Sequence, residues 1–555
     1  MFIYIWAFGV NVPYMDEWNE HYRVSLFLQG KHTLIGLFDQ HNEHRPATQR
    51  VALILLGALT SYNTKVEMMF TQWAMVLALL VLYVEFKKIF DSKAYLILFI
   101  PVPYIIFSLR QNENILWAHQ SCVYYSVIFG LLTCHFMSKI NSAGAKYNAL
   151  LQYCFGAVSA AAASFSLLSG LLAWPAGFFQ ILISDCKKGI KAVMLFLWSV
   201  MGTIVVLLYF HDYHKPPHHP GLDSFFKYPA EGIIYFIYLV GNTLFTGSFA
   251  SFITGVFIVA ATGLLLIFAN RGFLRKYSFW IASLCYFSAT LVLIAIGRAS
   301  LTFHYVIPVR YITFGIAIPI CLYVIYLGIT SENISNKLYN LSITIFIALS
   351  AFMLSSIVNS FDEGYGAGKT TKMQRERVAY YLYTYMSQPD KSLELMHLVP
   401  AQVREWAADL QKRKFSVFKQ PYLPPISELK ALPIETYCSG ILNSQLMNNI
   451  TSQVVIEDKH NIMRVEGWAV DNMEKDIAGG VYIKIDDMLF PALYGLYRPD
   501  VGNHLKSHAY VNSGYEAEIP VSLIDKGIHN LSIVVLTKDR KHYYKPTYNV
   551  AINRV

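Results

Sequence analysis

The sequence is poor in charged residues. Only 15% of its 555 residues are Asp, Glu, Lys or Arg, against about 25% in soluble domains. Apolar residues make up 55% of the chain, and the mean hydropathy is +0.38. These values exclude an ordinary soluble protein and favour a membrane protein.

Cysteine is scarce where a disulfide would matter. The chain has seven cysteines, and all except Cys438 lie in or beside apolar runs. A single cysteine cannot build a disulfide framework, so the less apolar C-terminal part is not a small disulfide-stabilised domain. The formal net charge of +9 does not indicate nucleic-acid binding, because much of the excess lies in short loops between the apolar runs.

Long apolar runs fill the chain from about 66 to 358. Those of roughly spanning length cover 66–86, 94–109, 120–138, 149–168, 171–184, 190–210, 248–269, 278–297, 311–328 and 340–358. Residues 1–13 are apolar but shorter than the roughly 20 residues that a span needs. The alternatives are a cleaved signal, which lacks a small-residue cleavage site here, and the favoured interpretation, a first span whose N-terminus is clipped or mis-started. The sequence therefore predicts a polytopic α-helical membrane protein with about eleven transmembrane helices.

Lys and Arg cluster in alternate loops between these runs. Positively charged loops are typically cytoplasmic, which fixes the predicted orientation. Keeping the alternation requires 231–247 to lie at the outer interface without crossing the membrane. The outer face then receives 14–65, 109–119, 211–247, 298–310 and all residues after 360. The expected location is a bacterial inner membrane, with the C-terminal part periplasmic or extracellular.

The C-terminal third differs from the rest of the chain in composition and in hydrophobic pattern. Residues 360–445 have helical character followed by a proline-broken linker, and 446–555 contain short β-type runs separated by turn residues. Such spacing predicts an all-β sandwich of about a hundred residues. We therefore expect three parts: a transmembrane bundle over 1–359, a helical segment and linker over 360–445, and a β-sandwich domain over 446–555.

An acidic pair follows the first apolar run. Asp16 and Glu17 stand beside Trp18 at the expected membrane surface. Such a pair is suited to act as a base or to hold a divalent cation such as Mg²⁺ or Mn²⁺. The alternative is two solvated loop charges next to an interfacial tryptophan. Asp16 is the one metal-ligand candidate, and the cofactor stays unknown at this point.

The string at 41–45 is dense in polar chemistry. It contains His41, Glu43, His44 and Arg45. Neighbouring residues do not share a helical face, and no three-ligand zinc spacing is present, which disfavours a stable metal site. Hydrogen bonding to phosphate or sugar is the favoured interpretation.

A second polar string precedes the run at 120–138. Gln111, Asn112, Glu113 and Trp117 combine amides, one carboxylate and an aromatic ring. Sugar-binding clefts use this combination for hydroxyl recognition and ring stacking. An ordinary polar loop that caps the next helix is an equal alternative.

Two arginines stand at one predicted membrane boundary. Arg298 ends one apolar run, and Arg310 with Tyr311 opens the next. Guanidinium groups match phosphate oxygens, so the pair suits a lipid-linked phosphate or diphosphate. Anchoring to lipid headgroups is the competing explanation.

Taken together, these strings resemble the GT-C superfamily of integral-membrane glycosyltransferases, and more closely a bacterial membrane-protein group within or near it. The resemblance covers about 1–415. The strings that carry it are Asp16-Glu17-Trp18, His41 to Arg45, Gln111 to Trp117, Gly170 to Pro175, Gly297-Arg298 and Arg310-Tyr311. The string at 41–45 is a departure, because better-known members lack it.

The resemblance implies a function. In GT-C enzymes an acidic residue of the first outer loop acts as base or metal ligand, and the donor is a polyprenyl-phosphate or polyprenyl-diphosphate sugar. Carried over, Asp16 is the catalytic candidate with Glu17 as its neighbour, and Arg298 and Arg310 hold the donor phosphate. The amides at 111–112, Glu113 and Trp117 surround sugar or acceptor.

We therefore expect a membrane glycosyltransferase that acts on a cell-surface glycan, lipid or protein. Its partners would be the bilayer, a polyprenyl-linked sugar donor and a glycan acceptor, without nucleic acid. One alternative is a transporter or flippase of lipid-linked saccharide, although the runs contain almost no midplane charge. The other is a non-catalytic assembly protein that binds glycan through its C-terminal domain.

Overall fold

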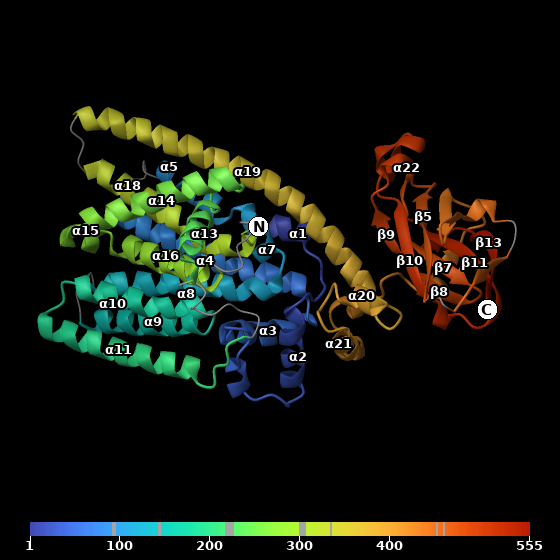
Figure 1. Ribbon diagram of the computed structural model, residues 1–555, viewed down its shortest axis with the longest axis horizontal. Coiled ribbons are helices and arrows are strands. Elements are labelled where there is room, and N and C mark those ends of the chain that lie inside the picture. The colour runs from blue at the N-terminus through green and yellow to red at the C-terminus, as the bar shows by residue number, and fades with distance from the viewer. Residues whose placement is uncertain are drawn as a thin grey trace. The chain divides into compact units, whose positions relative to one another are not determined.

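The protein is described by a computed structural model, in which residues 1–90, 96–141, 146–216, 227–298, 307–332, 336–450, 453–458 and 461–555 are placed (Figure 1). The chain divides into two compact units. The helical unit comprises Met1–Gly9 and Asn19–Lys372, and the β unit comprises Val10–Trp18 and Met373–Val555.

The helical unit is built of α-helices joined by short turns. Its α-helices are α1 (Phe2–Phe8), α2 (Glu17–Leu28), α3 (Ala47–Thr60), α4 (Thr64–Ile89), α5 (Leu96–Phe99), α6 (Pro101–Ile106), α7 (Asn112–Ile115), α8 (Ser121–Ser138), α9 (Lys146–Ser164), α10 (Ala173–Ile183), α11 (Lys188–Phe210), α13 (Pro229–Gly241), α14 (Ser248–Phe268), α15 (Arg271–Lys276), α16 (Ser278–Arg298), α17 (Ile312–Gly315), α18 (Ala317–Glu332) and α19 (Asn336–Tyr383). The last of these continues without a break into the β unit.

Six helices among the described residues are long and apolar enough to cross a membrane. They are Thr64–Ile89, Ala118–Ser138, Lys188–Phe210, Phe249–Phe268, Ser278–Arg298 and Val309–Ser331. Each coincides with a predicted span, so the expectation of a helical membrane protein is confirmed at this coarser level. Three further apolar helices are shorter, Ala47–Thr60, Leu168–Ile183 and Pro229–Gly241. The count of about eleven crossings stays a prediction.

Two predicted spans have a different local form. The run at 94–109 contains the short helices α5 and α6, which meet at Pro101. Proline has no N–H to donate to the preceding turn, so a new helix begins there. The run at 340–358 lies inside α19, which is 48 residues long.

Residues 231–241 of the predicted 231–247 segment lie in α13, a helix of only 13 residues. It packs tightly on α14 through two glycines. A Cβ atom at Gly241 would overlap the carbonyl oxygen of Ser251, and one at Gly255 would overlap the carbonyl oxygen of Ile237. The missing side chains therefore allow the two helix backbones to touch.

Ionisable side chains avoid the middle of the six long helices. Every Asp, Glu, Lys, Arg and His in them lies in the turns at the two ends, for example Glu67 and Glu85 in Thr64–Ile89. A charge in the middle of a bilayer costs several kcal/mol, roughly 2.5–3.5 on insertion scales. The placement leaves an uncharged layer across these six described helices.

The β unit begins with the end of α19, followed by α20 (Asp390–Leu393) and α21 (Pro400–Arg413). One described sheet contains β1 (Lys430–Ala431), β4 (Val454–Ile456), β7 (Gly480–Ile485), β8 (Met488–Pro491), β11 (Gly527–Leu536), β12 (His542–Tyr543) and β13 (Thr547–Arg554). The other contains β2 (Cys438–Leu442), β3 (Gln445–Leu446), β5 (Ile462–Asp471), β6 (Asp476–Ile477), β9 (Leu493–Leu496) and β10 (Gly514–Pro520), and α22 (Pro499–His504) follows β9.

The two sheets share one apolar core. Antiparallel pairing joins β11 to β7 and β13 in the first sheet and β5 to β2 and β10 in the second. Inward residues of both sheets, such as Val465, Ala517, Ile483 and Ile533, belong to a single cluster of buried side chains. Alternation along β10, in which buried and half-buried positions follow each other, produces this one-sided burial.

Candidate functional site

Three of the predicted polar strings, at 41–45, at 111–117 and at the arginines 298 and 310, meet at one end of the helical unit. The Nε atom of Arg45, just before α3, donates to the carbonyl oxygen of Tyr209 at the end of α11 at 2.6 Å. The Gln49 amide donates to the carbonyl oxygen of His119 at the start of α8 at 2.6 Å. We call this the loop-rich end. The opposite end carries Glu85, which lies 2.5 Å from Nδ1 of His135 and 2.6 Å from Nζ of Lys88.

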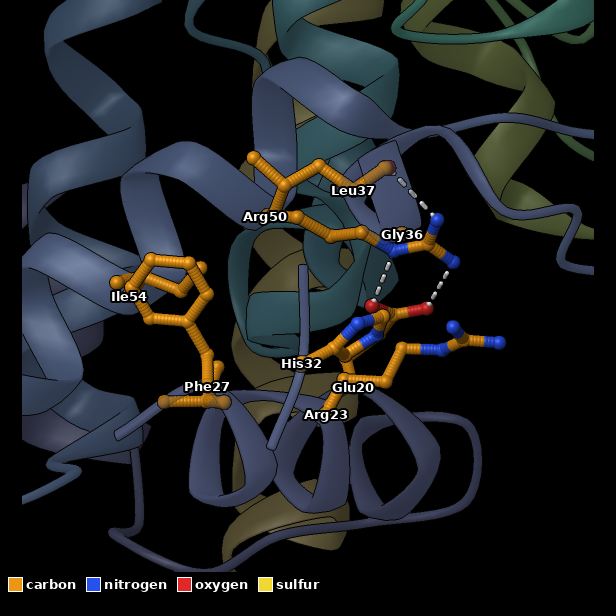
Figure 2. Close-up of a pocket in the computed structure, with 9 residues that line it drawn as sticks. Glu20, Arg23, Phe27, His32, Gly36, Leu37, Arg50 and Ile54 are labelled. Atoms are coloured by element: carbon orange, nitrogen blue, oxygen red, sulfur yellow. Dashed lines mark hydrogen bonds and ion pairs between the residues drawn. The ribbon is translucent and has the colours of Figure 1, made fainter. Parts of the chain in front are cut away.

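Glu20 and Arg50 form the most buried ion pair of the loop-rich end. Arg50 Nε donates to Glu20 Oε2 at 2.7 Å, and Nη2 donates to Oε1 at 2.9 Å. The Arg50 guanidinium also donates to the carbonyl oxygens of Leu37 and Asp39 at 2.9 and 2.5 Å. Figure 2 shows the two side chains face to face beside a small pocket, which Phe27 also lines.

The charge state of Glu20 follows from this pairing. Burial by itself raises the pKa of the carboxyl group, but the hydrogen bonds and positive charge of Arg50 outweigh it and lower the pKa to about 2. His41 and His119 act in the same direction. Glu20 is therefore an ionised structural carboxylate at neutral pH, and it is a poor general base.

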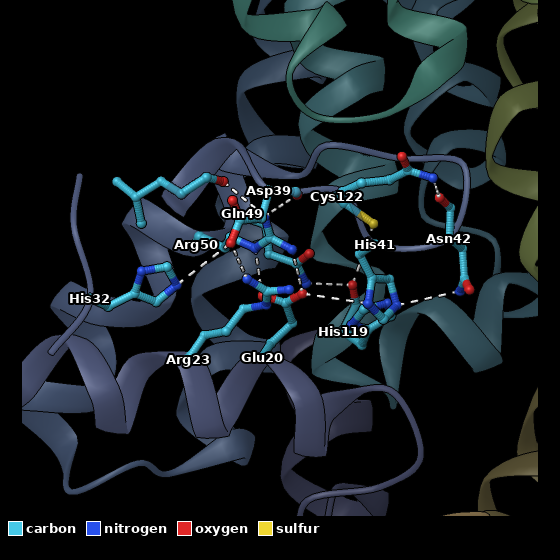
Figure 3. Close-up of polar contacts among 12 residues, drawn as sticks. Glu20, Arg23, His32, Asp39, His41, Asn42, Gln49, Arg50, His119 and Cys122 are labelled. Atoms are coloured by element: carbon cyan, nitrogen blue, oxygen red, sulfur yellow. Dashed lines mark hydrogen bonds and ion pairs between the residues drawn. The ribbon is translucent and has the colours of Figure 1, made fainter. Parts of the chain in front are cut away.

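Histidines surround this pair. His41 Nδ1 lies 3.7 Å from Glu20 Oε1, and the rings of His41 and His119 are 5.2 Å apart, edge to face. Figure 3 shows both rings on the same side of Glu20. The charge of His44 also acts on His119. The Trp117 ring is 5.6 Å from the His119 ring within the same loop, and the His41–His119 contact joins this loop to the string at 41–45.

The string at 41–45 is held in a tight turn. The backbones of His41 and His44 exchange hydrogen bonds at 2.8 and 2.9 Å, and Asn42 has a positive φ of 50°. His44 Nδ1 accepts the backbone N–H of Leu168 at 3.3 Å. Arg45 donates to the carbonyl oxygens of Phe38 and His211 as well as Tyr209. Its guanidinium therefore caps the C-terminal ends of the 3-10 turn Ile35–Phe38 and of α11.

The two predicted arginines each meet a predicted carboxylate. Arg298 Nη2 lies 3.4 Å from Glu43 Oε1, and Arg310 Nη1 donates to Glu113 Oε1 at 2.9 Å. Both arginines act electrostatically on Tyr235 of α13, and so does Tyr311. Arg298, Arg310 and Tyr311 are partly exposed, unlike Arg50. The arrangement places two forked cations with reachable donors around one tyrosine.

The amides at 111–112 have backbone partners. Gln111 is fully buried and donates to the carbonyl oxygens of Ile106 and Ser108 at 3.0 and 3.2 Å. Asn112 donates to the carbonyl oxygens of Leu109 and Arg110 at 3.3 Å. These amide groups stabilise the loop, and Glu113 reaches another predicted string through Arg310.

Two neighbouring residues were missed by the sequence reasoning. Asn114 donates to the carbonyl oxygen of Arg310 at 2.8 Å and to Thr313 Oγ1 at 2.7 Å. Arg110 is buried and bonds Glu363 of α19 at 3.0 Å. Both are polar residues in a loop where polar residues are expected. Only their partners far along the chain show that they lie beside the predicted strings.

Asp16 and Glu17 belong to the β unit. Glu17 is only 3% exposed, and its Oε2 accepts the backbone N–H of Tyr14 at 2.8 Å, which fixes the turn before α2. The Trp18 ring stacks near Trp406 at 6.4 Å. Asp16 is partly exposed and acts electrostatically on His397. Of the acidic pair, Asp16 is thus the more accessible carboxylate.

Comparisons with protein families, with curated proteins and with solved structures find no match.

Proposed function

We propose that the protein is a GT-C-type membrane glycosyltransferase. It moves a sugar from a polyprenyl-phosphate or polyprenyl-diphosphate donor to a cell-surface glycan, lipid or protein at the periplasmic face of a bacterial inner membrane. In this proposal the helical unit crosses the membrane with about eleven helices, and the β unit is a periplasmic sandwich that also binds carbohydrate.

The observation that carries the proposal is the pair of arginines at the loop-rich end. Arg298 and Arg310 stand at the termini of two membrane-length helices, and each is oriented by a carboxylate, Glu43 or Glu113. An anionic donor phosphate binds guanidinium forks through paired hydrogen bonds. A donor with a polyprenyl chain presents its phosphate where helix ends meet the membrane surface.

Charge distribution supports the orientation. The opposite end of the helical unit carries Lys88, Lys139 and Arg275, and positively charged loops favour the cytoplasmic side. The loop-rich end is then the periplasmic end. This is the side on which lipid-linked sugars meet surface acceptors.

The proposed reaction is a direct displacement with inversion at the anomeric carbon. Asp16 takes the proton of the acceptor hydroxyl, the hydroxyl oxygen bonds to the anomeric carbon, and the bond from that carbon to the phosphate oxygen breaks. The bonding electrons leave with the phosphate, whose charge Arg298 and Arg310 stabilise. Glu113 and Trp117 contact sugar or acceptor, and a divalent cation, if required, binds Asp16.

The test uses a strain that lacks the gene, complemented with plasmid-borne variants. Surface glycan and lipid-linked saccharide are measured by mass spectrometry, and membrane levels of the protein are measured by immunoblot. Asp16→Asn should lose the glycan product at a normal protein level, because the acceptor proton then has no base. Asp212→Asn, a change at an exposed carboxylate of the loop-rich end, should retain it. A normal glycan with Asp16→Asn contradicts the proposal.

A leaflet measurement on the same strains, with a membrane-impermeant glycosidase that reaches only periplasmic saccharide, separates the alternatives. If the protein were a flippase, its loss would confine lipid-linked saccharide to the cytoplasmic leaflet. The uncharged middle of the six described long helices disfavours this alternative. A non-catalytic assembly protein would give a defect on deletion but none with Asp16→Asn. Loss of a transferase should instead leave intact donor on the periplasmic leaflet.

A further inference from the structure

The second sheet of the β unit has an outer face that the apolar core does not use. Along β5, Val465 and Ala469 belong to the buried core between the two sheets. Side chains of a strand alternate between its two faces, so Glu466 and Trp468 lie on the outer face. Trp468 is half-buried there, although it contributes nothing to the core.

Small residues flank Trp468 on both neighbouring strands. Its cross-strand partners are Ser439 of β2 and Gly514 of β10, and neither has a side chain large enough to cover an indole ring. Just before β2, the carbonyl oxygen of Tyr437 accepts the N–H of Val470 at 3.1 Å, which continues the same pairing. Tyr437 is therefore a diagonal neighbour of Trp468 on the outer face, within reach of an aromatic side chain. Its side chain is 63% exposed.

An arginine reaches this face across the glycine of β10. A Cβ atom at Gly514 would lie 2.9 Å from Cγ of Arg498, so only glycine leaves room for the arginine to lie over the strand. The guanidinium is held by Asp500, to which Nε donates at 2.8 Å and Nη2 at 2.6 Å. The charge of Glu466 also acts on Arg498. The position of this cation is thus fixed by the protein itself.

Glu466 stands at an electrostatic disadvantage. Its cross-strand partner is Glu516 of β10, on the same face, and like charges directly opposite each other destabilise a sheet. Arg377 of α19 lies 3.5 Å from Glu516 and compensates that charge. A ligand that donates hydrogen bonds to Glu466 would offset the remaining repulsion.

The unused polar groups of this face complement one another. Among the residues that the structure describes, the indole N–H of Trp468, Nη1 of Arg498 and the carboxylate of Glu466 have no hydrogen-bond partner. The first two donate and the third accepts. A sugar hydroxyl does both, and the C–H face of a sugar ring packs on aromatic side chains.

We infer that Tyr437, Glu466, Trp468 and Arg498 form a binding site for a neutral pyranose unit of the surface glycan. The sugar ring packs on Trp468 and Tyr437. Its hydroxyl groups accept hydrogen bonds from Arg498 and from the indole N–H and donate to Glu466. The inference rests on the carbohydrate binding proposed for the β unit and gives that binding a location and a sugar class.

The mixed charge disfavours other occupants. Glu466 and Glu516 would repel an acidic polymer. An apolar protein surface would bury the Glu466 carboxylate without a hydrogen-bonding partner, which is unfavourable. A neutral sugar avoids both penalties.

The test measures sugar binding to the full-length protein in nanodiscs by fluorescence anisotropy. The probe is a mixture of labelled oligosaccharides released by mild acid from the surface polysaccharide of the wild-type strain. Glu466→Gln and Arg498→Gln should each weaken binding by roughly tenfold, because each removes a charge-assisted hydrogen bond. Tyr437→Ala should weaken it by about twofold to tenfold, as expected for one aromatic contact. Ile528→Ala, at an exposed residue of the other sheet, should bind as wild type does.

Trp468 is tested by two variants. Trp468→Ala should abolish measurable binding, and Trp468→Phe, which keeps an aromatic ring but loses the indole N–H, should give intermediate binding. Melting temperatures show whether each variant is folded. If Trp468→Ala is unstable, the exposed Tyr437 and the polar Glu466 still decide the outcome through their own variants.

Absence of binding by the wild-type protein overturns the inference, and so does wild-type affinity in both Glu466→Gln and Tyr437→Ala. Binding that disappears in high salt assigns the contact to charge alone and also overturns it. Asp16→Asn should bind the oligosaccharides as wild type does. A failure of the transferase proposal, seen as normal glycan with Asp16→Asn, is therefore distinct from a failure of this site.

Discussion

Glu20 of α2 and Arg50 of α3 are joined by two parallel hydrogen bonds, although 30 positions separate them in the chain. The two side chains are only 1% and 2% exposed. Removing two charges from water is unfavourable, and the pair is stable because each charge has a matched partner. The relationship holds the two helices of the first long loop together and makes both partners interdependent.

Loss of one partner should therefore be far more harmful than loss of both. Arg50→Met leaves the Glu20 carboxylate buried without its cation and should lower the free energy of unfolding by about 3–5 kcal/mol. The double variant Glu20→Leu with Arg50→Met should recover most of that loss. Thermal unfolding in nanodiscs, followed by tryptophan fluorescence, measures both.

Arg23→Gln, which breaks the more exposed pair with Asp39, should change the free energy of unfolding by only about 0–1 kcal/mol. Equal losses for single and double variants would contradict this.

The low pKa of Glu20 gives a defined acid dependence. Its pKa is about 2 in the folded protein against an ordinary value of 4.5, so the unfolded chain takes up its proton first as pH falls. The stabilisation from this group is complete above pH 4.5 and is lost as pH decreases toward 2. The melting-temperature difference between wild type and Glu20→Gln should shrink across that window. A difference that is constant with pH would show that Glu20 is not the titrating group.

The contact between α13 and α14 should be sensitive to a single methyl group. Gly255→Ala places a Cβ against the carbonyl oxygen of Ile237, whereas Gly263→Ala, on the same helix, places one in space open among the described residues. Backbone cannot move aside easily, so the first variant should unfold at a clearly lower temperature. Hydrogen exchange of α13 should rise with it. Matching melting temperatures for the two variants would exclude the close contact.

Asp471 organises a corner of the β unit. It is fully buried, and its carboxylate accepts the backbone N–H groups of Met473, Glu474 and Lys538 and the hydroxyl of Tyr544. Asp471→Ala leaves these donors unsatisfied, each at a cost of roughly 1–3 kcal/mol.

Proteolysis of the full-length chain should then cut within the β unit at lower protease concentration. Amide exchange at Met473 and Lys538 should accelerate as well. Asp500→Ala, at an exposed carboxylate, is the matched control. Unchanged exchange at Lys538 in Asp471→Ala would show that the bond is unimportant.

The proposed phosphate contact makes a prediction about charge and shape. Arg310→Gln removes the cation and its fork, and it should reduce the glycan product in complemented cells by roughly tenfold or more, because charge-assisted hydrogen bonds contribute about 1.5–3 kcal/mol. Arg310→Lys should restore part of the product, since it keeps only the point charge. Arg271→Gln, at an exposed arginine of the α14–α16 turn, should have no effect. Full product with Arg310→Gln would remove Arg310 from the site.

Hydropathy predicted the long helices because a membrane span must satisfy its own backbone and present apolar side chains over its whole length. Thr64–Ile89 and Ser278–Arg298 follow the predicted runs closely. The run at 94–109 shows the limit of the method, since Pro101 ends one helix and starts another without changing the hydropathy. Periodicity likewise indicated strands such as β5 and β11 but not their order in the sheets.

The site could be predicted as a set of polar strings but not as a network. The contacts of Glu43 with Arg298 and of Glu113 with Arg310 join residues about 200 positions or more apart, and nothing in either string specifies its partner. Glu20 was missed because it is an ordinary acidic residue of a polar loop. Arg50 had a signal, because a single charge on an otherwise apolar helix needs an inward partner.

The uncharged middle of the six long helices has an electrical consequence. The voltage across a membrane acts only on charges that lie within or move through the field, at about 2.3 kcal/mol per elementary charge per 100 mV. With ionisable groups of these helices confined to their end turns, hardly any charge is available to sense the field. The transfer proposed for the helical unit should therefore run at the same rate in energised and in depolarised membranes, with its driving force supplied by the proposed donor.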